Sequence, residues 1–538
     1  MNPMLLPGLL GLLLASLLSG QAMAMEPLEL GRRIYQEGRR ADGTPLSAVV
    51  QGDIPLTGTQ MNCMSCHRRS GMGSFEGGAV TLPVTGDILY RPREKGRWQL
   101  NHSRLLGSLP RPAYDDASLA RAIRDGVDPA GRRLEALMPR YELDDTELAA
   151  LIAYMKTLNA FDDPGVDHAA IHFATVVAGP VAPDRRQALQ AVIQAFLRDK
   201  NSGARFEHGT ARFPRWHRER KYRAYRRWEV HTWTLQGDPE SWQAQLAAYY
   251  REQPVFAVLG GLADGAWQPV HDFCEATGVP CLFPSTDLPG QGESHYNLYF
   301  SRGMALEARA LARHLRQRQS PGPILQLYRD NPESRAAARA FREAMDGAAL
   351  RELSIDAPPT AAQWNTWLGG APATTLVLWL PAEDLVNLPA RTVAPDTGRL
   401  FLSGTLAPPA SLAGLAGRER LHLVYPFVLE EDRAQGTRRT RAWVRGKGIT
   451  PRDLRTEADT LFALTAANVA LKHMIDHFSR DYFIERLEHY AEYALSPSMY
   501  PRLSLGPGQR FAAKGAWIVA LAGNAGQILE SHGEWIVP

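Results

Sequence analysis

The spacing of apolar and polar positions changes about a third of the way along the chain. In the first part, apolar residues recur at helical spacing in Leu30 to Gly38 and again in Asp145 to Lys156, where Asp144 or Asp145 can serve as N-cap. Residues 161–167 then have the composition of a turn. Beyond them, short apolar runs alternate with amphipathic stretches. The pattern predicts a helical domain followed by an α/β domain.

The second part contains a series of strand-like and helix-like segments. Alternation of this kind favours right-handed βαβ units and a parallel sheet. Two such series in residues 169–538 predict two lobes around a cleft, with ligands bound beyond the carboxyl ends of the strands. The expected strands are residues 171–177, 230–235, 255–259, 281–283, 324–328, 376–380, 400–402 and 421–425, and the expected helices include 185–198, 242–251, 267–276 and 333–345.

An apolar run from Leu5 to Leu18 opens the chain and is followed by Ala22-Met23-Ala24. A short apolar run before a small-x-small site is typical of a secretory signal peptide. The alternative, a membrane anchor, is disfavoured because 14 residues are too few to span about 30 Å of hydrocarbon as a helix. We therefore expect residues 1–24 to be a signal peptide and the remainder to be a soluble protein of the periplasm.

Charge and cysteine content narrow the class of protein further. The 538 residues include 60 Lys and Arg against 57 Asp and Glu, so the net charge gives no reason to expect a nucleic-acid partner. Four cysteines are too few for a disulfide-built scaffold. The basic run 215–227 is interpreted as a solvated face, or as a surface that docks an acidic redox partner or an anionic membrane.

The most specific motif is Cys63-Met64-Ser65-Cys66-His67, the arrangement for covalent attachment of haem c. Its chance expectation in this composition is roughly 0.001. Cys63 and Cys66 can form thioethers with one porphyrin, and His67 is then held beside the iron. A thioredoxin-like redox pair or half of a zinc site would need a βαβ context or a second Cys/His pair, and neither lies nearby. We expect one covalent haem.

Met138, in the segment Leu137-Met138-Pro139-Arg140-Tyr141, is the candidate for the second axial ligand of the iron. Residues 26–158 resemble the class I c-type cytochromes, in which a Met-Pro loop supplies the distal thioether before a C-terminal helix. The resemblance implies that His67 and Met138 ligate the iron and that the function is electron transfer, since a Met/His pair raises the potential and leaves no open position. Met138→Ala should open that position.

Two further expectations accompany this resemblance. Tyr154 should face Gly31 and Tyr35 in a packed helix pair, and the carbonyl at Leu82 should orient the ring of His67. The polar insert between Ala41 and Gln60 departs from the family pattern and has no assigned role.

The second part resembles the type 1 periplasmic solute-binding proteins, especially the receptors for branched-chain amino acids or amides. The resemblance rests on AVLGGLADGAWQPVHDFCEATGVPCLFPST, YNLYFSRGMALEARALARHL and RLSLGPGQRFAAKGAWIV. It implies ligand loops at residues 262–265 and 284–287 and, in the second lobe, around Asp330, Pro381 and Thr405. Asp264 stands where a hydroxyl is usual and Thr405 where an acid is usual, which argues against amino-acid specificity. The candidate ligand residues are Asp264, Gly265, Ser285, Thr286, Asp287 and Thr405.

Cys274 and Cys281 lie at a predicted helix end and in the following strand, so they can form a disulfide or remain two buried thiols. The predicted organisation is a signal peptide (1–24), an all-α class I cytochrome c domain (25–160), a linker (161–168) and a two-lobed α/β solute-binding-like domain (169–538).

Three functions fit this organisation. The first is a periplasmic electron carrier whose second domain senses a small ligand or docks a redox partner, such as a dehydrogenase or another cytochrome. The second is the receptor of an ABC-type transporter, with a permease as partner and the haem as an accessory. The third, a haem peroxidase, requires an exchangeable iron site and is disfavoured by Met138. No G-x-S-x-G, G-x-x-x-x-G-K-[ST] or H-E-x-x-H motif occurs, so we expect no enzyme and no catalytic residues.

Overall fold

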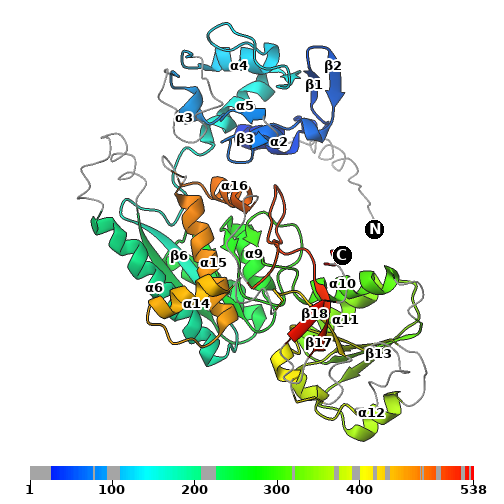
Figure 1. Cartoon of the computed structure of the whole chain (residues 1–538). Helices are drawn as coiled ribbons and strands as arrows, with labels where there is room; N and C mark the ends of the chain where they lie inside the picture. Colours follow the sequence, from blue (N-terminus) through cyan, green and yellow to red (C-terminus); the bar gives the residue numbers. More distant parts are fainter. Residues whose placement is uncertain are drawn as a thin grey trace, which may run out of the picture. The chain divides into compact units, whose positions relative to one another are not determined.

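The chain divides into two compact units, residues 1–160 and 161–538 (Figure 1). The predicted signal peptide and most of the basic run, residues 215–225, lie outside the described residues. None of the described helices combines the length and the apolar character that a membrane span requires. The computed structural model describes residues 26–538 except 77–78, 94–109, 207–225, 318–321, 369–374, 390–399, 413, 416–420, 430–436, 473, 475–477, 492–498, 523–527 and 532–534.

The first unit is mainly helical, as predicted. Asp144 is the N-cap of its longest helix: its side chain accepts a hydrogen bond from the Glu147 amide at 2.8 Å, and the Glu147 carboxylate accepts one from the Asp144 amide at 3.2 Å. Asp115 and Ser118 form the same reciprocal cap on another helix. The helices are α1 (Pro27–Arg32), the π-helical continuation η1 (Arg33–Glu37), the 3-10 turn η2 (Thr59–Met61), α2 (Met64–His67), α3 (Gly86–Leu89), α4 (Asp116–Asp125) and α5 (Asp145–Thr157).

Helices α1 and α5 pack closely because a glycine stands at their crossing. A Cβ atom on Gly31 would lie 2.2 Å from the carbonyl oxygen of Ala150 and 2.6 Å from Cβ of Tyr154. The rings of Tyr35 and Tyr154 pack with centroids 5.6 Å apart, and Gln36 donates to the Tyr154 hydroxyl at 2.7 Å. The expectation that Tyr154 faces Gly31 and Tyr35 is therefore confirmed.

The polar insert between Ala41 and Gln60 forms a β-hairpin of β1 (Ser47–Val50) and β2 (Ile54–Thr57). The other edge of β1 pairs with β5 (Arg140–Tyr141), which directly follows the predicted methionine ligand. A second small hairpin joins β3 (Ser74–Glu76) to β4 (Ala79–Thr81). The insert thus supports a segment that lies some 90 residues further along the chain.

The second unit contains two sheets, one for each predicted lobe. The first sheet is parallel, with strand order β11-β10-β8-β6-β7 and β9 beside β6. The second has the order β13-β12-β14-β15-β16-β17-β18, in which the pairs β16/β17 and β17/β18 are antiparallel. The strands are β6 (Ala170–Ala178), β7 (Arg227–Leu235), β8 (Ala257–Leu259), β9 (Leu262–Ala263), β10 (Cys281–Leu282), β11 (Asn297–Leu298), β12 (Ile324–Arg329), β13 (Leu350–Ile355), β14 (Thr375–Trp379), β15 (Leu400–Ser403), β16 (Leu421–Tyr425), β17 (Trp517–Ala522) and β18 (Ile528–Ser531).

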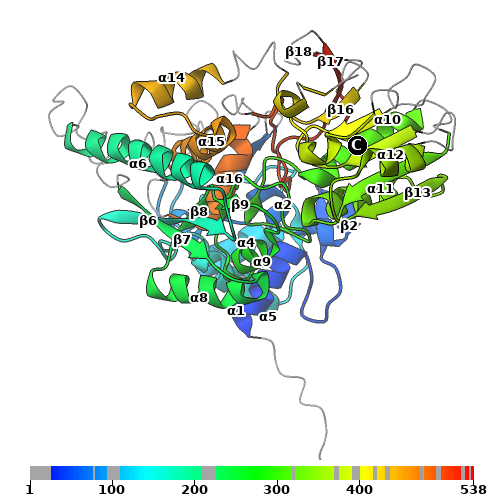
Figure 2. The same ribbon diagram turned by 90° about the horizontal axis from the view of Figure 1, so that it is seen from below.

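Helices cover both faces of the first sheet (Figure 2). Helices α6 (Pro183–Phe206) and α15 (Leu454–Leu471) lie on one face, and α8 (Trp242–Glu252) and α9 (Gln268–Thr277) lie on the other. Accordingly β6 is buried on both sides: Phe173 belongs to the apolar cluster under α6 and α15, and Ala174 to the cluster under α8 and α9. This two-sided burial is typical of parallel strands and explains their continuous apolar sequence.

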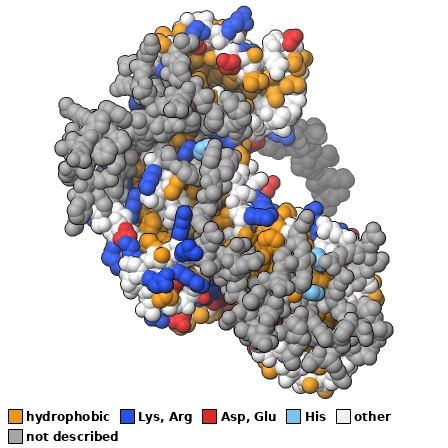
Figure 3. Space-filling model, in the orientation of Figure 1, with side chains coloured by type: hydrophobic (Ala, Val, Ile, Leu, Met, Phe, Trp, Pro, Cys, Tyr) orange, Lys and Arg blue, Asp and Glu red, His pale blue; other side chains and the backbone are white. Residues whose placement is uncertain are grey.

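The chain passes between the lobes several times. Helices α10 (Met304–Gln317), α11 (Pro332–Ala344) and α12 (Ala361–Leu368) belong to the second lobe, whereas α14 (Arg438–Gly446), α15 and α16 (Arg480–Ala491) return to the first. The last two strands, β17 and β18, then rejoin the second sheet. On the face shown in Figure 3, Lys and Arg side chains gather over α6 and α14.

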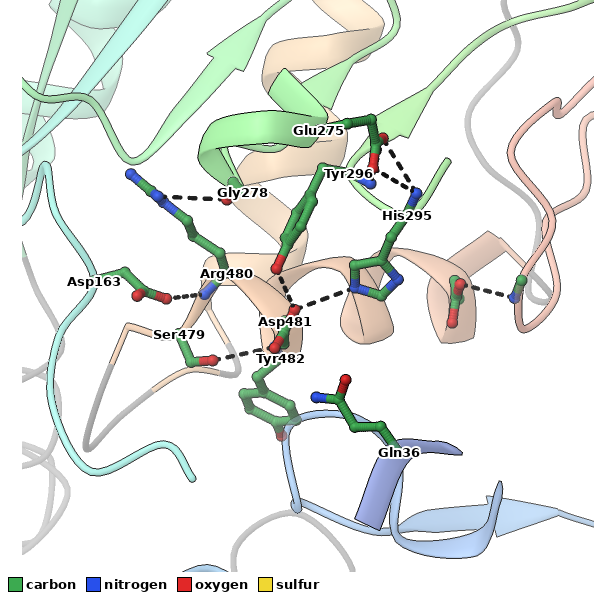
Figure 4. A network of polar contacts seen from close by, with 12 residues as sticks. Gln36, Asp163, Glu275, Gly278, His295, Tyr296, Ser479, Arg480, Asp481 and Tyr482 are labelled. Atoms are coloured by element: carbon green, nitrogen blue, oxygen red, sulfur yellow. Dashed lines mark hydrogen bonds and ion pairs between the residues drawn. The ribbon is translucent and has the colours of Figure 1, made fainter. Parts of the chain in front are cut away.

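The start of the second unit, which includes the predicted linker, is fixed to α16 and the residues just before it (Figure 4). Asp162 accepts a hydrogen bond from the Phe478 amide at 2.8 Å, and Asp163 accepts one from the Arg480 amide at 2.6 Å. The buried Arg480 guanidinium donates to the carbonyls of Pro164 and Val255. Residues 162–164 are therefore held by specific bonds within the second unit.

Candidate functional site

The haem-attachment motif occupies a single helical turn in the first unit. Helix α2 begins directly after Cys63, so Cys63, Cys66 and His67 lie within one turn. Asn62 fixes the start of this turn, because its side-chain oxygen accepts a hydrogen bond from the Ser65 amide at 2.7 Å.

His67 is oriented by a backbone carbonyl. Its Nδ1 atom lies 2.8 Å from the oxygen of Leu82. A carbonyl oxygen only accepts hydrogen bonds, so Nδ1 carries the proton and Nε2 keeps its lone pair for a metal ion. The expectation that the Leu82 carbonyl orients His67 is confirmed.

Two tyrosines hold the backbone on either side of the motif. The Tyr141 hydroxyl donates to the carbonyl of Met61 at 2.8 Å, and the Tyr35 hydroxyl donates to the carbonyl of Arg68 at 2.8 Å. Both tyrosines are buried in the core of the first unit. The backbone before the motif is thus tied to β5, and the backbone after it is tied to η1.

Met138 is partly buried against the same core. The hairpin of the insert holds its loop from one side: Val49 of β1 pairs with Arg140, and the Gln51 amide donates to the carbonyl of Ala136 at 2.9 Å. The Arg140 guanidinium donates to the carbonyl of Met138 itself. These bonds fix the backbone of the Met-Pro loop.

In the second unit, the two predicted first-lobe loops lie side by side at the carboxyl ends of the strands. Leu262 and Ser285 form a parallel bridge that joins residues 262–265 to residues 284–287. Arg185, in the first turn of α6, forms an ion pair with Asp264 and donates to the carbonyl of Ser285 at 3.4 Å. One arginine therefore links both loops.

Helix α15 contributes two charged residues to the same place. Arg455 donates to the two carboxylate oxygens of Asp287 at 2.6 and 3.2 Å and to the Tyr500 hydroxyl at 3.0 Å. One turn further along, Asp459 accepts a hydrogen bond from the Ser285 hydroxyl at 2.9 Å. A bidentate Arg–carboxylate pair of this kind is strong and geometrically specific.

Asp459 is 1% exposed. Burial raises the pKa of Asp459 to about 7, although Arg455 and the Ser285 hydroxyl act in the opposite direction. Its second oxygen, Oδ1, has no hydrogen-bond partner among the described residues. The side chain is therefore an acid that titrates near neutral pH and has one oxygen free to bond.

Glu307, on α10 of the second lobe, is a second buried acid. Its side chain is fully buried, and this burial raises its pKa to about 7. The hydroxyls of Thr405 and Ser403 lie near enough to lower this pKa, although neither carboxylate oxygen has a well-formed hydrogen bond among the described residues. Glu307 thus places a buried acid beside Thr405, one of the predicted ligand residues.

The other predicted ligand residues have separate local contacts or backbone roles. Thr286 turns its hydroxyl toward its own backbone and accepts from the Leu288 amide at 3.1 Å. Gly265 has a φ of 121°, which favours glycine and explains its presence in the loop. In the second lobe, Asp330 pairs with Arg335, and Pro381 precedes a short 3-10 helix, η5 (Ala382–Leu385).

Cys274 and Cys281 are both fully buried free thiols in the structure. Burial raises the pKa of Cys274 well above its usual range, and its contact with Cys281 raises it further. Both alternatives expected from the sequence, a disulfide and two buried thiols, stay predictions.

Comparison with known proteins identifies the first unit. Residues 57–159 match the family model of cytochrome c. This segment is a cytochrome c domain. A search of curated proteins gives no match for the chain.

The second unit has the two-lobed periplasmic-binding-protein fold. Among solved structures, the chain resembles a branched-chain amino-acid ABC transporter protein from Thermus thermophilus with bound valine, with a TM-score of 0.50, 14% identity, and coverage of 70% of this chain and 97% of that one. A fatty-acid ABC transporter substrate-binding protein from Thermomonospora curvata gives a TM-score of 0.48, 14% identity, and coverage of 70% and 95%. At this identity the likeness shows the fold alone.

The donor set of the cytochrome c domain fits haem c. Two thiols in one helical turn match the two thioether bonds of the group, and the adjacent imidazole has Nε2 available. The thioether of Met138, which packs against the same core, would supply the soft neutral second donor to the iron. The residues that would hold the group are Cys63, Cys66, His67 and Met138.

Sequence reasoning missed Arg185, Glu307, Arg455, Asp459 and Tyr500. Arg185 could have been found, because it stands in the first turn of the helix that follows β6 and so lies at the carboxyl edge of the sheet. Arg455 and Asp459 are four residues apart on one helix face. Their helix lies between β16 and β17 in the sequence, which are both strands of the second sheet, and nothing local indicates that it returns to the first lobe.

Proposed function

We propose that this protein is an exported electron carrier with one covalent haem c, joined to a domain that binds a small polar ligand between its lobes. The observation that carries the proposal of a haem-based electron carrier is the geometry of His67. The Leu82 carbonyl fixes its ring, and Nε2 keeps a lone pair that can bind iron. The match to the cytochrome c family supports it. Export is supported by the apolar N-terminal run, which has the pattern of a secretory signal peptide. A covalent haem c and a binding-protein fold are both consistent with a periplasmic location.

Haem bound here would supply a one-electron iron couple. The residues of the chain determine how that couple is used. The hydrogen bond from His67 Nδ1 to the Leu82 carbonyl fixes the tautomer and the orientation of the imidazole, which leaves Nε2 for the iron. The hairpin bonds to residues 136–140 hold the Met138 loop in place, so the Met138 thioether would occupy a second position on the iron and exclude small molecules from it. The site then favours electron transfer over reaction with peroxide or oxygen.

The proposal that the second unit binds a small ligand rests on the charged side chains that lie at the carboxyl ends of the strands of the first sheet. Arg185 and Arg455 are cations that can receive a ligand carboxylate if they exchange their bonds to Asp264 and Asp287. Asp459, with one unbonded oxygen, and Glu307 can accept hydrogen bonds from hydroxyl or amino groups. A small molecule that carries both a carboxylate and a hydroxyl or amino group suits this set.

A thermal-shift screen of the haem-loaded, signal-free protein tests this binding function. The compounds are amino acids, amides, alcohols and small organic acids, because a ligand that prefers the native state raises the melting temperature. We expect a saturable shift with a carboxylate-bearing compound that is lost in Arg455→Met, which removes a proposed carboxylate-binding cation, and kept in Arg452→Met, whose arginine is exposed and pairs with Asp184. If no class gives a shift, the domain is a docking scaffold for a redox partner.

The alternative is the receptor of an ABC-type transporter with an accessory haem, favoured by the fold of the second unit. The two functions differ in whether ligand binding is coupled to the redox state of the haem. If ligand binding serves electron transfer, a ligand that binds must shift the haem midpoint potential, and haem reduction must shift ligand affinity by the same free energy. A transport receptor needs no such shift, so a redox titration with and without the ligand separates the two.

A further inference from the structure

A cluster of metal-ligating side chains lies away from both sites described above. It extends from the third residue of β6 and β7 to the middle of β7, whereas the candidate ligand loops lie at the carboxyl ends of the strands. The strand register pairs His172 of β6 with Glu229 of β7, and the next residue on the same face of β7 is His231. Since alternate residues of a strand share a face, all three side chains project from one side of the sheet.

The donor atoms are spaced as one metal ion would require. Nδ1 of His172 lies 3.2 Å from Nε2 of His231 and 3.6 Å from a carboxylate oxygen of Glu229. One ligand atom from each of the three residues can be chosen so that all lie within 4.8 Å of one another. Ligands bound to a tetrahedral zinc ion at about 2.0–2.1 Å stand about 3.3 Å apart. The contact between the two histidines matches that spacing.

Asp167 holds His172 in the orientation that a metal ligand needs. Its Oδ2 lies 3.1 Å from Nε2 of His172, so this nitrogen carries the proton and Nδ1 presents its lone pair to Glu229 and His231. Its other oxygen, Oδ1, is fixed by the amides of Ala169 and Ala170 at 2.6 and 2.8 Å. A carboxylate behind a histidine in this manner is the usual outer partner of a metal-bound imidazole.

We propose that His172, Glu229 and His231 bind one divalent late transition metal, with Asp167 as the positioning residue. Two imidazoles and one carboxylate favour ions such as zinc, copper or nickel over calcium or magnesium. The His172 side chain is 14% exposed and that of Glu229 is 42% exposed, so an ion can reach the site from solvent and keep a water ligand. Without a metal, Nε2 of His231 can donate a hydrogen bond to Nδ1 of His172. Metal binding at Nε2 of His231 requires this proton to move to Nδ1 of the same ring.

Equilibrium dialysis of the full haem-loaded chain against zinc chloride, followed by measurement of the zinc-to-iron ratio, tests the proposal. The variants are Glu229→Gln, which changes an exposed side chain without loss of volume, and His231→Ala. His168→Ala is the matched control, because it removes an exposed histidine from the same segment but outside the cluster. Asp167→Asn tests the positioning role.

We expect one zinc ion per haem at micromolar zinc in the wild-type chain and in His168→Ala, and a zinc-dependent rise in melting temperature that EDTA reverses. Asp167→Asn should lose about 10–100-fold in affinity, and Glu229→Gln and His231→Ala should lose more. The proposal is overturned if the wild-type chain binds no zinc, which would leave a hydrogen-bonded histidine pair. It is also overturned if Glu229→Gln binds zinc as tightly as the wild type.

Discussion

The cytochrome c domain and the binding domain position their polar groups with different kinds of bond. Around the haem motif, the side chains of Tyr35, His67 and Tyr141 donate to backbone carbonyls. In the binding domain, the candidate ligand loops are held by charged side chains, as in the pair of Asp287 with Arg455. Carbonyl oxygens do not titrate, whereas carboxylates do. The bonds to carbonyls give the haem motif no acceptor that titrates, whereas the binding domain contains Asp459 beside these loops, a buried carboxyl whose pKa is raised to about 7 by burial.

The difference between bonds to backbone carbonyls and ion pairs between side chains also affects how easily each site can exchange a bound group. A site tied by neutral bonds to the backbone is suited to a permanent group, because nothing in it has to move. Ion pairs between side chains can be exchanged for equivalent pairs with a ligand, at the cost of breaking the first set. This contrast fits a fixed haem in one domain and an exchangeable ligand in the other.

Replacement of Met138, the proposed second ligand of the iron, should have the largest effect. In Met138→Ala, the iron of the haem-loaded protein should lose its low-spin spectrum and bind carbon monoxide after reduction, because the variant lacks the proposed thioether ligand. Met72→Ala is the control: the Met72 sulfur accepts a hydrogen bond from Asn159 and is already engaged. An unchanged low-spin spectrum in Met138→Ala would refute the assignment.

In the binding domain, Arg455→Met should destabilise the fold by about 2–3 kcal/mol, because it removes hydrogen bonds to a carboxylate. Arg452→Met removes an exposed ion pair with Asp184 and should cost well under 1 kcal/mol. Thermal unfolding followed by far-UV circular dichroism measures both. Equal losses in the two variants would show that the pair of Asp287 and Arg455 has no special role.

In the cytochrome c domain, Gly31→Ala should destabilise by about 1–3 kcal/mol, because its Cβ would overlap the carbonyl of Ala150. The loss of Soret absorbance on heating reports this domain separately. Gly446→Ala, at an exposed helix position of the second unit with open space around it, is the control and should leave this Soret transition unchanged. A melting temperature for Gly31→Ala equal to that of the wild type would mean that α1 and α5 do not pack as described.

The buried acids sharpen the contrast in pH response. Asp459 has a native pKa of about 7 against an ordinary value near 4, so between these values the native state holds a proton that the unfolded state has lost. The free energy of unfolding should therefore fall as the pH rises from about 4 to about 7, and Asp459→Asn should fall less steeply. Melting curves at several pH values measure this slope, with the exposed Asp346→Asn as control. Identical slopes in Asp459→Asn and wild type would count against a raised native pKa.

Local signals explain what could be predicted from the sequence. The attachment motif, the cap at Asp144 and the strand pattern of the second unit depend on near neighbours, and the structure has them where they were expected. The insert at 41–60 was not assigned because its partner, β5, lies far along the chain. Arg455 was missed for the same reason: it meets Asp287 across 168 residues. A contact between residues that are far apart in the sequence produces no periodic pattern of apolar and polar positions around either residue, so the sequence alone does not reveal it.

The measurement that tests the central claim most directly is the optical spectrum of the reduced full chain before and after addition of carbon monoxide. The account requires both axial positions to be filled, by His67 and Met138, for electron transfer. It predicts a low-spin spectrum that carbon monoxide leaves unchanged. Rapid conversion to a carbon monoxide complex would contradict it and would indicate a haem that binds or reacts with small molecules.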